Sequence, residues 1–246
     1  MSESKLDIEN NKIKLEQYHS YEEANFFYQM ENGGLICFVG SKGSGKTTFL
    51  NSLLTYYLTE HPDYFDVMLL VLPSFKREVE DKYKFLKDYK KRKPKITVYE
   101  SYSELLTHAL MNRKKQVRTL LLLDDATGEK LYSQDNEFIR LIVQLRHMRT
   151  TLLCAVHSVR SIMSTTFRNN ISFLLLFDIT NAYLLRTMWE EWFSLRFKKF
   201  IDFENVYEEH SKLDHGIMGF VLNTKPKKID MFVHNWHVFK KYRVID

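Results

Sequence analysis

Short apolar runs recur along the chain and are separated by longer segments of helical period. Most of these runs lack the polar–apolar alternation of a half-exposed strand, so they predict strands of a parallel sheet covered on both faces. The runs are Leu35–Val39, Val67–Leu72, Ile96–Tyr99, Thr119–Leu123, Thr151–Val156 and Ile171–Phe177. Helices are predicted at Lys46–Thr59, Phe75–Tyr89, Tyr102–Met111, Asn136–His147 and Asn181–Phe197. This alternation indicates an α/β fold with a mainly parallel central sheet flanked by helices.

The two ends of the chain depart from this alternation. Residues 1–32 are predicted to be an N-terminal extension that contains a short amphipathic helix at Ser20–Met30, and residues 33–246 are predicted to form the main domain. Near the other end, Gly216–Leu222 and Ile229–Val233 enclose a segment that contains Pro226, which predicts an antiparallel β-hairpin. The polar start of the chain does not resemble a signal peptide, and no apolar run is long enough to cross a bilayer.

A glycine-rich loop follows the first apolar run of the domain. Its sequence is Gly40-Ser41-Lys42-Gly43-Ser44-Gly45-Lys46-Thr47, which matches the P-loop pattern G-x-x-x-x-G-K-S/T between a predicted strand and a predicted helix. Glycine lets the backbone N–H groups turn towards phosphate oxygens, and the helix N-terminus favours an anion. We expect Lys46 to reach the β- and γ-phosphates, Thr47 to ligate Mg²⁺, and Thr48 to complete the binding residues for ATP.

Two acidic residues, Asp124 and Asp125, end the strand predicted at Thr119–Leu123. The ends of parallel strands are where the sites of α/β proteins form. Asp124 is predicted to hold Mg²⁺, mostly through water, and Asp125 to orient or deprotonate the attacking water. The alternative for Asp125 is a role in capping the following loop. His157 ends the next strand and is a candidate for sensing the γ-phosphate or positioning the attacking water, with a structural role as the equal alternative.

Arginine residues near strand ends are candidates for stabilising the transition state from a neighbouring subunit. They are Arg146, Arg168 and Arg149, and for each of them a surface ion pair is the alternative.

The charge of the chain permits nucleic acid as a partner without requiring it. The net charge is +5, with 36 Lys and Arg against 31 acidic residues. Two basic runs, Lys87–Lys95 and Arg113–Lys115, could contact DNA phosphates, although a solvated surface is the favoured interpretation. The two cysteines, Cys37 and Cys154, lie in apolar runs and are expected to be buried reduced thiols.

These motifs, in this order, resemble the FtsK–HerA superfamily of DNA-pumping ATPases. Within it the chain is most similar to the genome-packaging ATPases of large DNA viruses of the poxvirus type and their relatives in virophages and polinton-like elements. The resemblance covers roughly Asn32 to Trp236. It is carried by the P-loop, by Leu120–Asp125, by Leu145-Arg146-His147, by the strand that ends at His157, and by Phe167-Arg168-Asn169-Asn170.

The resemblance implies a P-loop NTPase fold of the additional-strand, catalytic-glutamate type. It also implies a homo-oligomeric ring that uses ATP to translocate double-stranded DNA into a preformed capsid, with a capsid or portal component as a further partner. Arg146 or Arg168 would then reach the nucleotide of a neighbouring subunit. The expected location is soluble in the host-cell cytoplasm, at the viral factory, or in the virion, without membrane insertion. One departure from the family is His157, since relatives commonly carry Gln or another amide there.

Two other functions fit the same P-loop. A nucleoside or small-molecule kinase would need an acceptor pocket and usually an arginine-rich lid, and no clear lid lies between the predicted helices. A nucleotide-gated scaffold would bind ATP as a switch and hydrolyse it slowly. The pair Asp124-Asp125 favours water as the acceptor of the phosphoryl group and therefore favours the motor.

Overall fold

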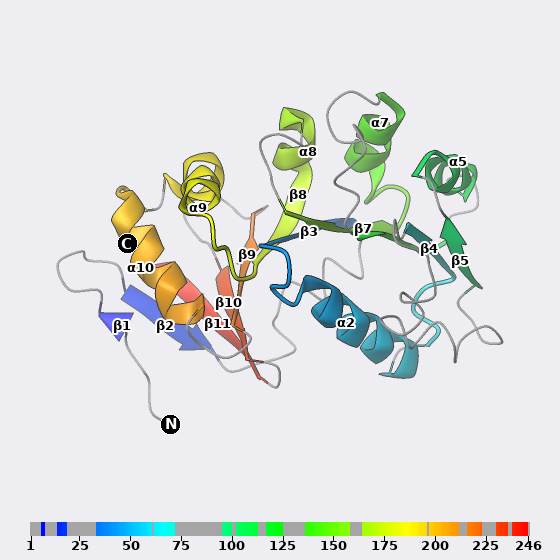
Figure 1. Ribbon diagram of the computed structural model, residues 1–246. Helices are drawn as coiled ribbons and strands as arrows, with labels where there is room; N and C mark the ends of the chain where they lie inside the picture. Colours follow the sequence, from blue (N-terminus) through cyan, green and yellow to red (C-terminus); the bar gives the residue numbers. More distant parts are fainter. Residues whose placement is uncertain are drawn as a thin grey trace.

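A single sheet runs through the whole width of the molecule and carries helices on both faces (Figure 1). The computed structural model describes residues 6–7, 14–18, 33–60, 62–71, 95–99, 102–112, 117–124, 136–157, 164–195, 197–211, 216–222, 230–235 and 238–245. No helix in these ranges is long and apolar enough to cross a membrane.

Six parallel strands form one half of the sheet, and each of them corresponds to a predicted apolar run. In spatial order they are β8 (Ile171–Leu176), β3 (Gly34–Val39), β7 (Thr150–Val156), β6 (Thr119–Asp124), β4 (Val67–Val71) and β5 (Lys95–Tyr99). Every residue of the four strands from β8 to β6 is buried, which explains why their sequences show no polar alternation. Because β7 lies between β3 and β6, the additional strand that the resemblance implied is confirmed.

Five antiparallel strands extend the sheet beyond β8. In order outwards they are β9 (Ile217–Val221), β10 (Asp230–Asn235), β11 (Val238–Ile245), β2 (Lys14–Tyr18) and β1 (Leu6–Asp7). The pair β9–β10 is the predicted C-terminal hairpin, which is therefore confirmed. Part of the N-terminal extension belongs to the same sheet, because β2 pairs with the last strand of the chain. The helix predicted at Ser20–Met30 lies outside the described residues.

The helices cover the two faces of the parallel half unequally. In Figure 1, α2 (Lys46–Glu60) lies on one face, whereas α5 (Tyr102–Asn112), α7 (Asn136–Gln144), α8 (Thr165–Asn170) and α9 (Ala182–Met188) lie on the other. The helix predicted at Asn181–Phe197 is α9 followed by the π-helix η3 (Trp189–Phe193). Two helices, α8 and α10 (Phe200–Ser211), were not predicted. The helix predicted at Phe75–Tyr89 lies outside the described residues.

Two apolar cores result from this arrangement, one on each face of the sheet. The side chains of β3 alternate between them, with Leu35 and Cys37 in one core and Ile36 and Phe38 in the other.

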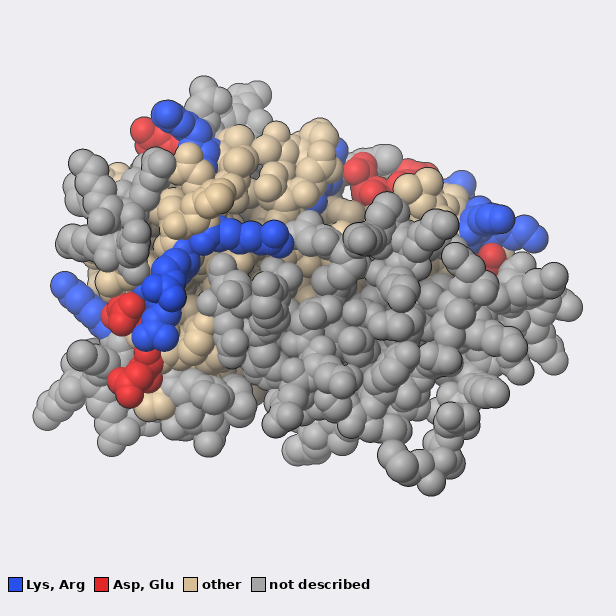
Figure 2. Space-filling view, turned by 180° about the vertical axis from the view of Figure 1, so that it is seen from behind, with Lys and Arg blue, Asp and Glu red and all other residues tan. Residues whose placement is uncertain are grey.

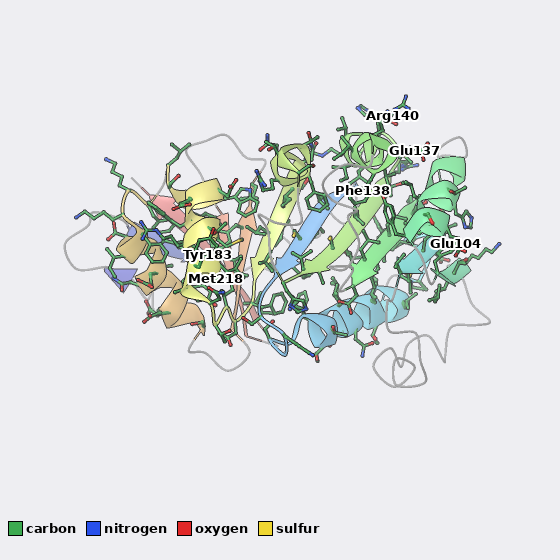
Figure 3. All side chains as sticks on the ribbon, turned by 45° about the horizontal axis from the view of Figure 1, so that its top comes forward. Glu104, Glu137, Phe138, Arg140, Tyr183 and Met218 are labelled. Atoms are coloured by element: carbon green, nitrogen blue, oxygen red, sulfur yellow. The ribbon has the colours of Figure 1, made fainter. Side chains whose placement is uncertain are left out.

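Phe138 on α7 is fully buried beneath the helix, while Glu137 and Arg140 are exposed and point away from the sheet (Figure 3). Such an apolar stripe on a polar helix fixes which side faces the sheet.

The two cysteines lie at paired positions on neighbouring parallel strands. Cys37 and Cys154 are partners on β3 and β7, and both are buried free thiols as predicted; burial raises the pKa of the Cys37 thiol.

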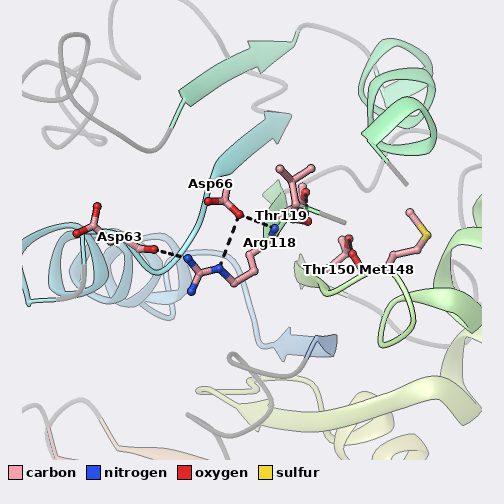
Figure 4. Close-up of polar contacts among 7 residues, drawn as sticks. Asp63, Asp66, Arg118, Thr119, Met148 and Thr150 are labelled. Carbon is pink, nitrogen blue, oxygen red and sulfur yellow. Dashed lines mark hydrogen bonds and ion pairs between the residues drawn. The ribbon is translucent and has the colours of Figure 1, made fainter. Parts of the chain in front are cut away.

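At the start of β6, the Arg118 side chain donates to the Asp63 carbonyl oxygen and lies 3.7 Å from the Asp66 carboxylate (Figure 4). The backbone N–H of Arg118 also donates to Asp66 at 2.8 Å. These contacts join the beginnings of β4 and β6.

Candidate nucleotide-binding site

The predicted P-loop lies between the carboxyl end of β3 and the first turn of α2. Gly43 and Gly45 have φ angles of +82° and +91°, a conformation that side chains other than that of glycine rarely adopt. The loop borders a pocket of about 420 Å³. The lining residues are Lys42, Gly43, Ser44, Gly45, Lys46, Thr47, Thr48, Asn51, Asp124 and His157. Tertiary structure therefore brings the loop, the first acid and the candidate sensor to one cavity.

Lys46 is almost completely buried at this pocket and is surrounded by oxygen atoms of its own loop. Its ammonium group donates to the carbonyl oxygens of Gly40 and Ser41, each at 2.8 Å. It also lies 3.4 Å from the Ser44 hydroxyl. A buried cation needs such partners to offset the loss of hydration. The ammonium group is thus held at the loop where the phosphates of a nucleotide would provide alternative anionic partners.

Thr47 and Asp124 meet at the edge of the pocket. The Thr47 hydroxyl donates to one Asp124 carboxylate oxygen at 3.0 Å, and Asp124 is 7% exposed. Neighbouring ligands of an octahedral Mg²⁺ ion, with bonds of about 2.1 Å, lie roughly 3 Å apart. The two oxygen atoms therefore fit adjacent positions on one Mg²⁺ ion. Within the described residues, no cluster of three or more His, Cys, Asp and Glu side chains could hold a metal.

His157, at the end of β7, contacts the P-loop directly. Its Nδ1 atom lies 3.0 Å from the Gly40 carbonyl oxygen and 3.2 Å from the Lys46 ammonium group. One ring nitrogen cannot donate to the carbonyl and accept from the ammonium group at the same time. The tautomer of His157 therefore decides which of the two partners it binds. This geometry is compatible with a sensor and also with a purely local structural role.

A segment that sequence reasoning missed supports the loop from the β8 side. The Ser41 N–H donates to the Asp178 carbonyl oxygen at 2.8 Å, and the Thr180 N–H donates to the Ser41 hydroxyl at 2.9 Å. A Cβ atom on Gly40 would lie 2.7 Å from Cβ of Phe177, so only glycine allows this close approach. No local signal could have identified these contacts.

Asn51 also lines the pocket and was not predicted from the sequence. It lies one helical turn after Thr47, and that spacing places both side chains on the same side of α2. Helical periodicity from Thr47 could have found it.

The candidate arginines do not lie at this pocket within one subunit. Arg146 lines a second pocket of about 400 Å³ near the amino ends of β3 and β8, which is the opposite edge of the sheet. Arg168 lies on α8, and its Nε atom is 3.1 Å from the Glu191 carboxylate. Arg149 has a φ angle of +50°, and its carbonyl oxygen accepts from the Thr119 N–H at 3.2 Å. Any action of these residues on a nucleotide would therefore require a second subunit.

Several sequence predictions lie outside the described residues or remain without support. The structure does not describe Asp125 or the basic run Arg113–Lys115. Of the basic run Lys87–Lys95, it describes only Lys95. On the face drawn in Figure 2, the described Lys and Arg side chains lie in separate groups, several of them beside acidic side chains. One group forms a short unbroken run of blue from the lower left towards the centre of the view, and the described basic side chains do not extend across the whole face.

Comparisons with known proteins agree with this fold. The family model of the poxvirus A32 protein matches residues 27–217. The genome-packaging NTPase B204 of Sulfolobus turreted icosahedral virus 2, solved with AMPPCP, is 16% identical, with a TM-score of 0.59 over 83% of this chain and 98% of that one. Its complex with ATP-gammaS gives the same TM-score over 83% and 97%.

B204 of Sulfolobus turreted icosahedral virus, described as a DNA-packaging ATPase, is also 16% identical, with a TM-score of 0.57 over 83% and 98%. At this identity the likeness establishes the fold and nothing further. No curated protein sequence matches the chain.

Proposed function

The chain belongs to the family of poxvirus A32 proteins, and from this premise we propose that it is an ATP-driven translocase of double-stranded DNA that packages a viral genome into a preformed capsid. The single observation that carries the proposal is the nucleotide site itself. It combines a complete P-loop with the Thr47–Asp124 pair, on a fold shared with viral genome-packaging NTPases. The host-cell cytoplasm is the proposed location and rests on the family alone.

The positions of the described residues support a separate role for each of them in ATP hydrolysis. The backbone N–H groups of the P-loop would bind the phosphates, and Lys46 would exchange its carbonyl partners for β- and γ-phosphate oxygens. Thr47 and Asp124 would hold Mg²⁺, which supplies positive charge beside the phosphates. Asp125 would orient or deprotonate the attacking water, because it follows Asp124 at the end of β6. His157 would respond to the γ-phosphate through its contacts with Gly40 and Lys46.

A homo-oligomeric ring around DNA is the proposed assembly. Arg146 lies at the edge of the sheet opposite the P-loop, so a head-to-tail arrangement of subunits would bring it towards the next subunit's nucleotide. Heterologous contacts of this kind form a ring when the rotation between successive subunits closes. Arg168 is the alternative for the same role, at the cost of its ion pair with Glu191. A capsid or portal component would be the further partner.

The test is steady-state ATP hydrolysis by the full chain with and without duplex DNA, with Mg²⁺ present. We expect several-fold stimulation by DNA, and we expect Lys46→Ala to abolish both rates because it removes the cation that faces the phosphates. A matched control is Lys198→Ala, which removes an exposed lysine outside the residues that line the pocket and should leave the rate without DNA unchanged.

Assembled oligomers whose turnover ignores duplex DNA would contradict the motor. In that case, slow hydrolysis unchanged by Asp125→Asn would indicate a nucleotide-gated scaffold, and phosphate transfer to a nucleoside would indicate a kinase.

A further inference from the structure

A buried tyrosine from α10 is bonded to the segment that supports the P-loop. Tyr207 is 4% exposed, and its hydroxyl accepts a hydrogen bond from the Ile179 N–H at 2.6 Å. The same hydroxyl donates to the Phe177 carbonyl oxygen at 3.0 Å. One side chain thus satisfies two backbone groups of the segment Phe177–Thr180, which follows β8.

This segment is bonded to the P-loop along its length. The Phe177 N–H donates to the Val39 carbonyl oxygen at 2.8 Å, and the Ser41 N–H donates to the Asp178 carbonyl oxygen at 2.8 Å. Thr180 donates its N–H to the Ser41 hydroxyl, and the two hydroxyl oxygens lie 2.9 Å apart. The segment therefore fixes the loop at the residue where β3 ends and at the first residue after Gly40.

We propose that Tyr207 is a positioning residue for nucleotide binding: its hydroxyl fixes the segment Phe177–Thr180, which in turn holds Ser41 and the P-loop in the conformation that binds phosphate. The inference rests only on the part of the proposed function that places a nucleotide at the P-loop, and it does not depend on DNA. Binding requires several N–H groups of the loop to converge on the same phosphates. A loop held in that conformation before binding loses less conformational freedom when the nucleotide arrives.

The absence of a Cβ atom at Gly40 makes the loop sensitive to this segment. A Cβ atom there would meet Phe177 Cβ and Asp178 O, at 2.7 and 3.2 Å. The segment and the loop are therefore in van der Waals contact as well as hydrogen-bonded. A displacement of the segment would therefore displace the P-loop directly, because the two are in contact with each other.

Tyr207→Phe removes the hydroxyl and keeps the ring, which makes it the central test. Nucleotide affinity is measured by titrating the full chain with a fluorescent ATP analogue and Mg²⁺, without DNA and well below the unfolding temperature of each variant. We expect Kd to rise about fivefold, because the loss of a typical net hydrogen bond corresponds to a factor of that order. In hydrolysis, KM for ATP should rise while kcat stays within about twofold of the wild type.

A matched control separates positioning from a general loss of structure. Thr150→Val removes another buried hydroxyl, which donates to the Met148 carbonyl oxygen at 3.1 Å at the start of β7, outside the residues that line the nucleotide pocket. We expect its Kd and KM to equal those of the wild type. A merely structural role of Tyr207 would lower the fraction of active protein, and thus kcat, at unchanged KM.

Thr180→Val provides a second test if Tyr207→Phe does not fold. It removes the hydroxyl contact with Ser41 at an exposed position and keeps the backbone hydrogen bond. We expect Kd to rise about twofold. Where both single variants fold, the double variant should weaken binding by less than the product of the two single effects. Wild-type affinity in Tyr207→Phe, or in Thr180→Val if the first variant does not fold, would overturn the inference. A wild-type chain that binds no nucleotide would overturn the proposed function as well, whereas turnover that ignores DNA would overturn only the motor.

Discussion

At the scale of single residues, glycine is required in the P-loop for two different physical reasons. Gly43 and Gly45 adopt positive φ angles, and a Cβ atom at either position would meet nothing within 4 Å. Their requirement is therefore one of backbone conformation. Gly40 instead lacks space, because a Cβ atom there would lie 2.7 Å from both Phe177 Cβ and Ser44 Oγ. The pattern of the motif specifies Gly40 and Gly45 but not Gly43, and only the fold reveals that Gly40 also serves the contact with the segment that follows β8.

Tyr207 gives a prediction about pH. Burial, as the largest cause, raises the pKa of Tyr207 from its ordinary value of 10.0 to about 12. The folded state therefore favours the neutral hydroxyl, so the associated stability is fully present below about pH 10 and is lost as the pH rises towards about 12. We expect the difference in Tm between the wild type and Tyr207→Phe to shrink across this range.

Thermal unfolding of both proteins from about pH 8 to about pH 12 measures this difference. Other tyrosines and lysines titrate equally in the two proteins and cancel. A difference that stays constant with pH would show that the hydroxyl does not resist ionisation in the folded state.

At the scale of elements, α8 and the π-helix η3 are joined by the ion pair between Arg168 and Glu191. Their side chains are 16% and 23% exposed, and the two atoms are 3.1 Å apart. The pair thus fixes a short helix that precedes β8 against the element that follows α9. It also competes with the predicted role of Arg168 towards a neighbouring subunit.

Glu191→Gln tests which role Arg168 has. If the ion pair is structural, the free energy of unfolding should fall by about 1 kcal/mol in a denaturant titration, at the upper end of values for such pairs. The matched control is Glu190→Gln. Its partner Arg186 lies one helical turn earlier, and the Arg186 side chain is 63% exposed. That change should cost no more than about 0.5 kcal/mol. Unchanged stability combined with altered ATP turnover would instead assign Arg168 to the neighbouring nucleotide.

A strand or helix can be predicted from the sequence when neighbouring residues alone show its pattern. The parallel strands were predicted to within one residue at every end, because burial on both faces leaves a continuous apolar run. Helix α10 carries Phe203, Val206 and Tyr207 at helical spacing and could have been recognised. Helix α8 has only six residues, too few to show a period. The change from α9 to a π-helix at Trp189 has no sequence signature.

At the scale of the whole molecule, the sheet separates the P-loop from Arg146. The P-loop follows the carboxyl end of β3, whereas the pocket that contains Arg146 includes Gly34, the first residue of the same strand. A strand of six residues spans about 20 Å, so Arg146 cannot serve the nucleotide of its own subunit. If it acts in hydrolysis, it acts on a neighbour.

Mixing two inactive variants tests this arrangement. In mixed oligomers, Arg146→Ala subunits supply intact P-loops and Lys46→Ala subunits supply intact arginines, so we expect ATP turnover above that of either variant alone. The size of the recovered turnover depends on how the two variants mix. In an equimolar random mixture, about a quarter of the interfaces combine an intact P-loop with an intact Arg146. The matched control mixes Lys46→Ala with Asp124→Asn, which leaves every nucleotide site defective and should recover nothing. Absence of recovery in both mixtures would exclude Arg146 as a residue that acts between subunits.

The sequence by itself determined the strands, the P-loop and Asp124, because each is encoded by residues that are adjacent along the chain. Its prediction of Asp125 as the residue that activates water is tested by the hydrolysis rate of Asp125→Asn. The tertiary structure alone decided the contacts that position the loop. Ser41 and Thr180 are 139 positions apart, and Gly40 and His157 are 117 apart. Such pairs meet only because β3 lies between β7 and β8, and the order of strands in a sheet is set by the packing of the whole chain.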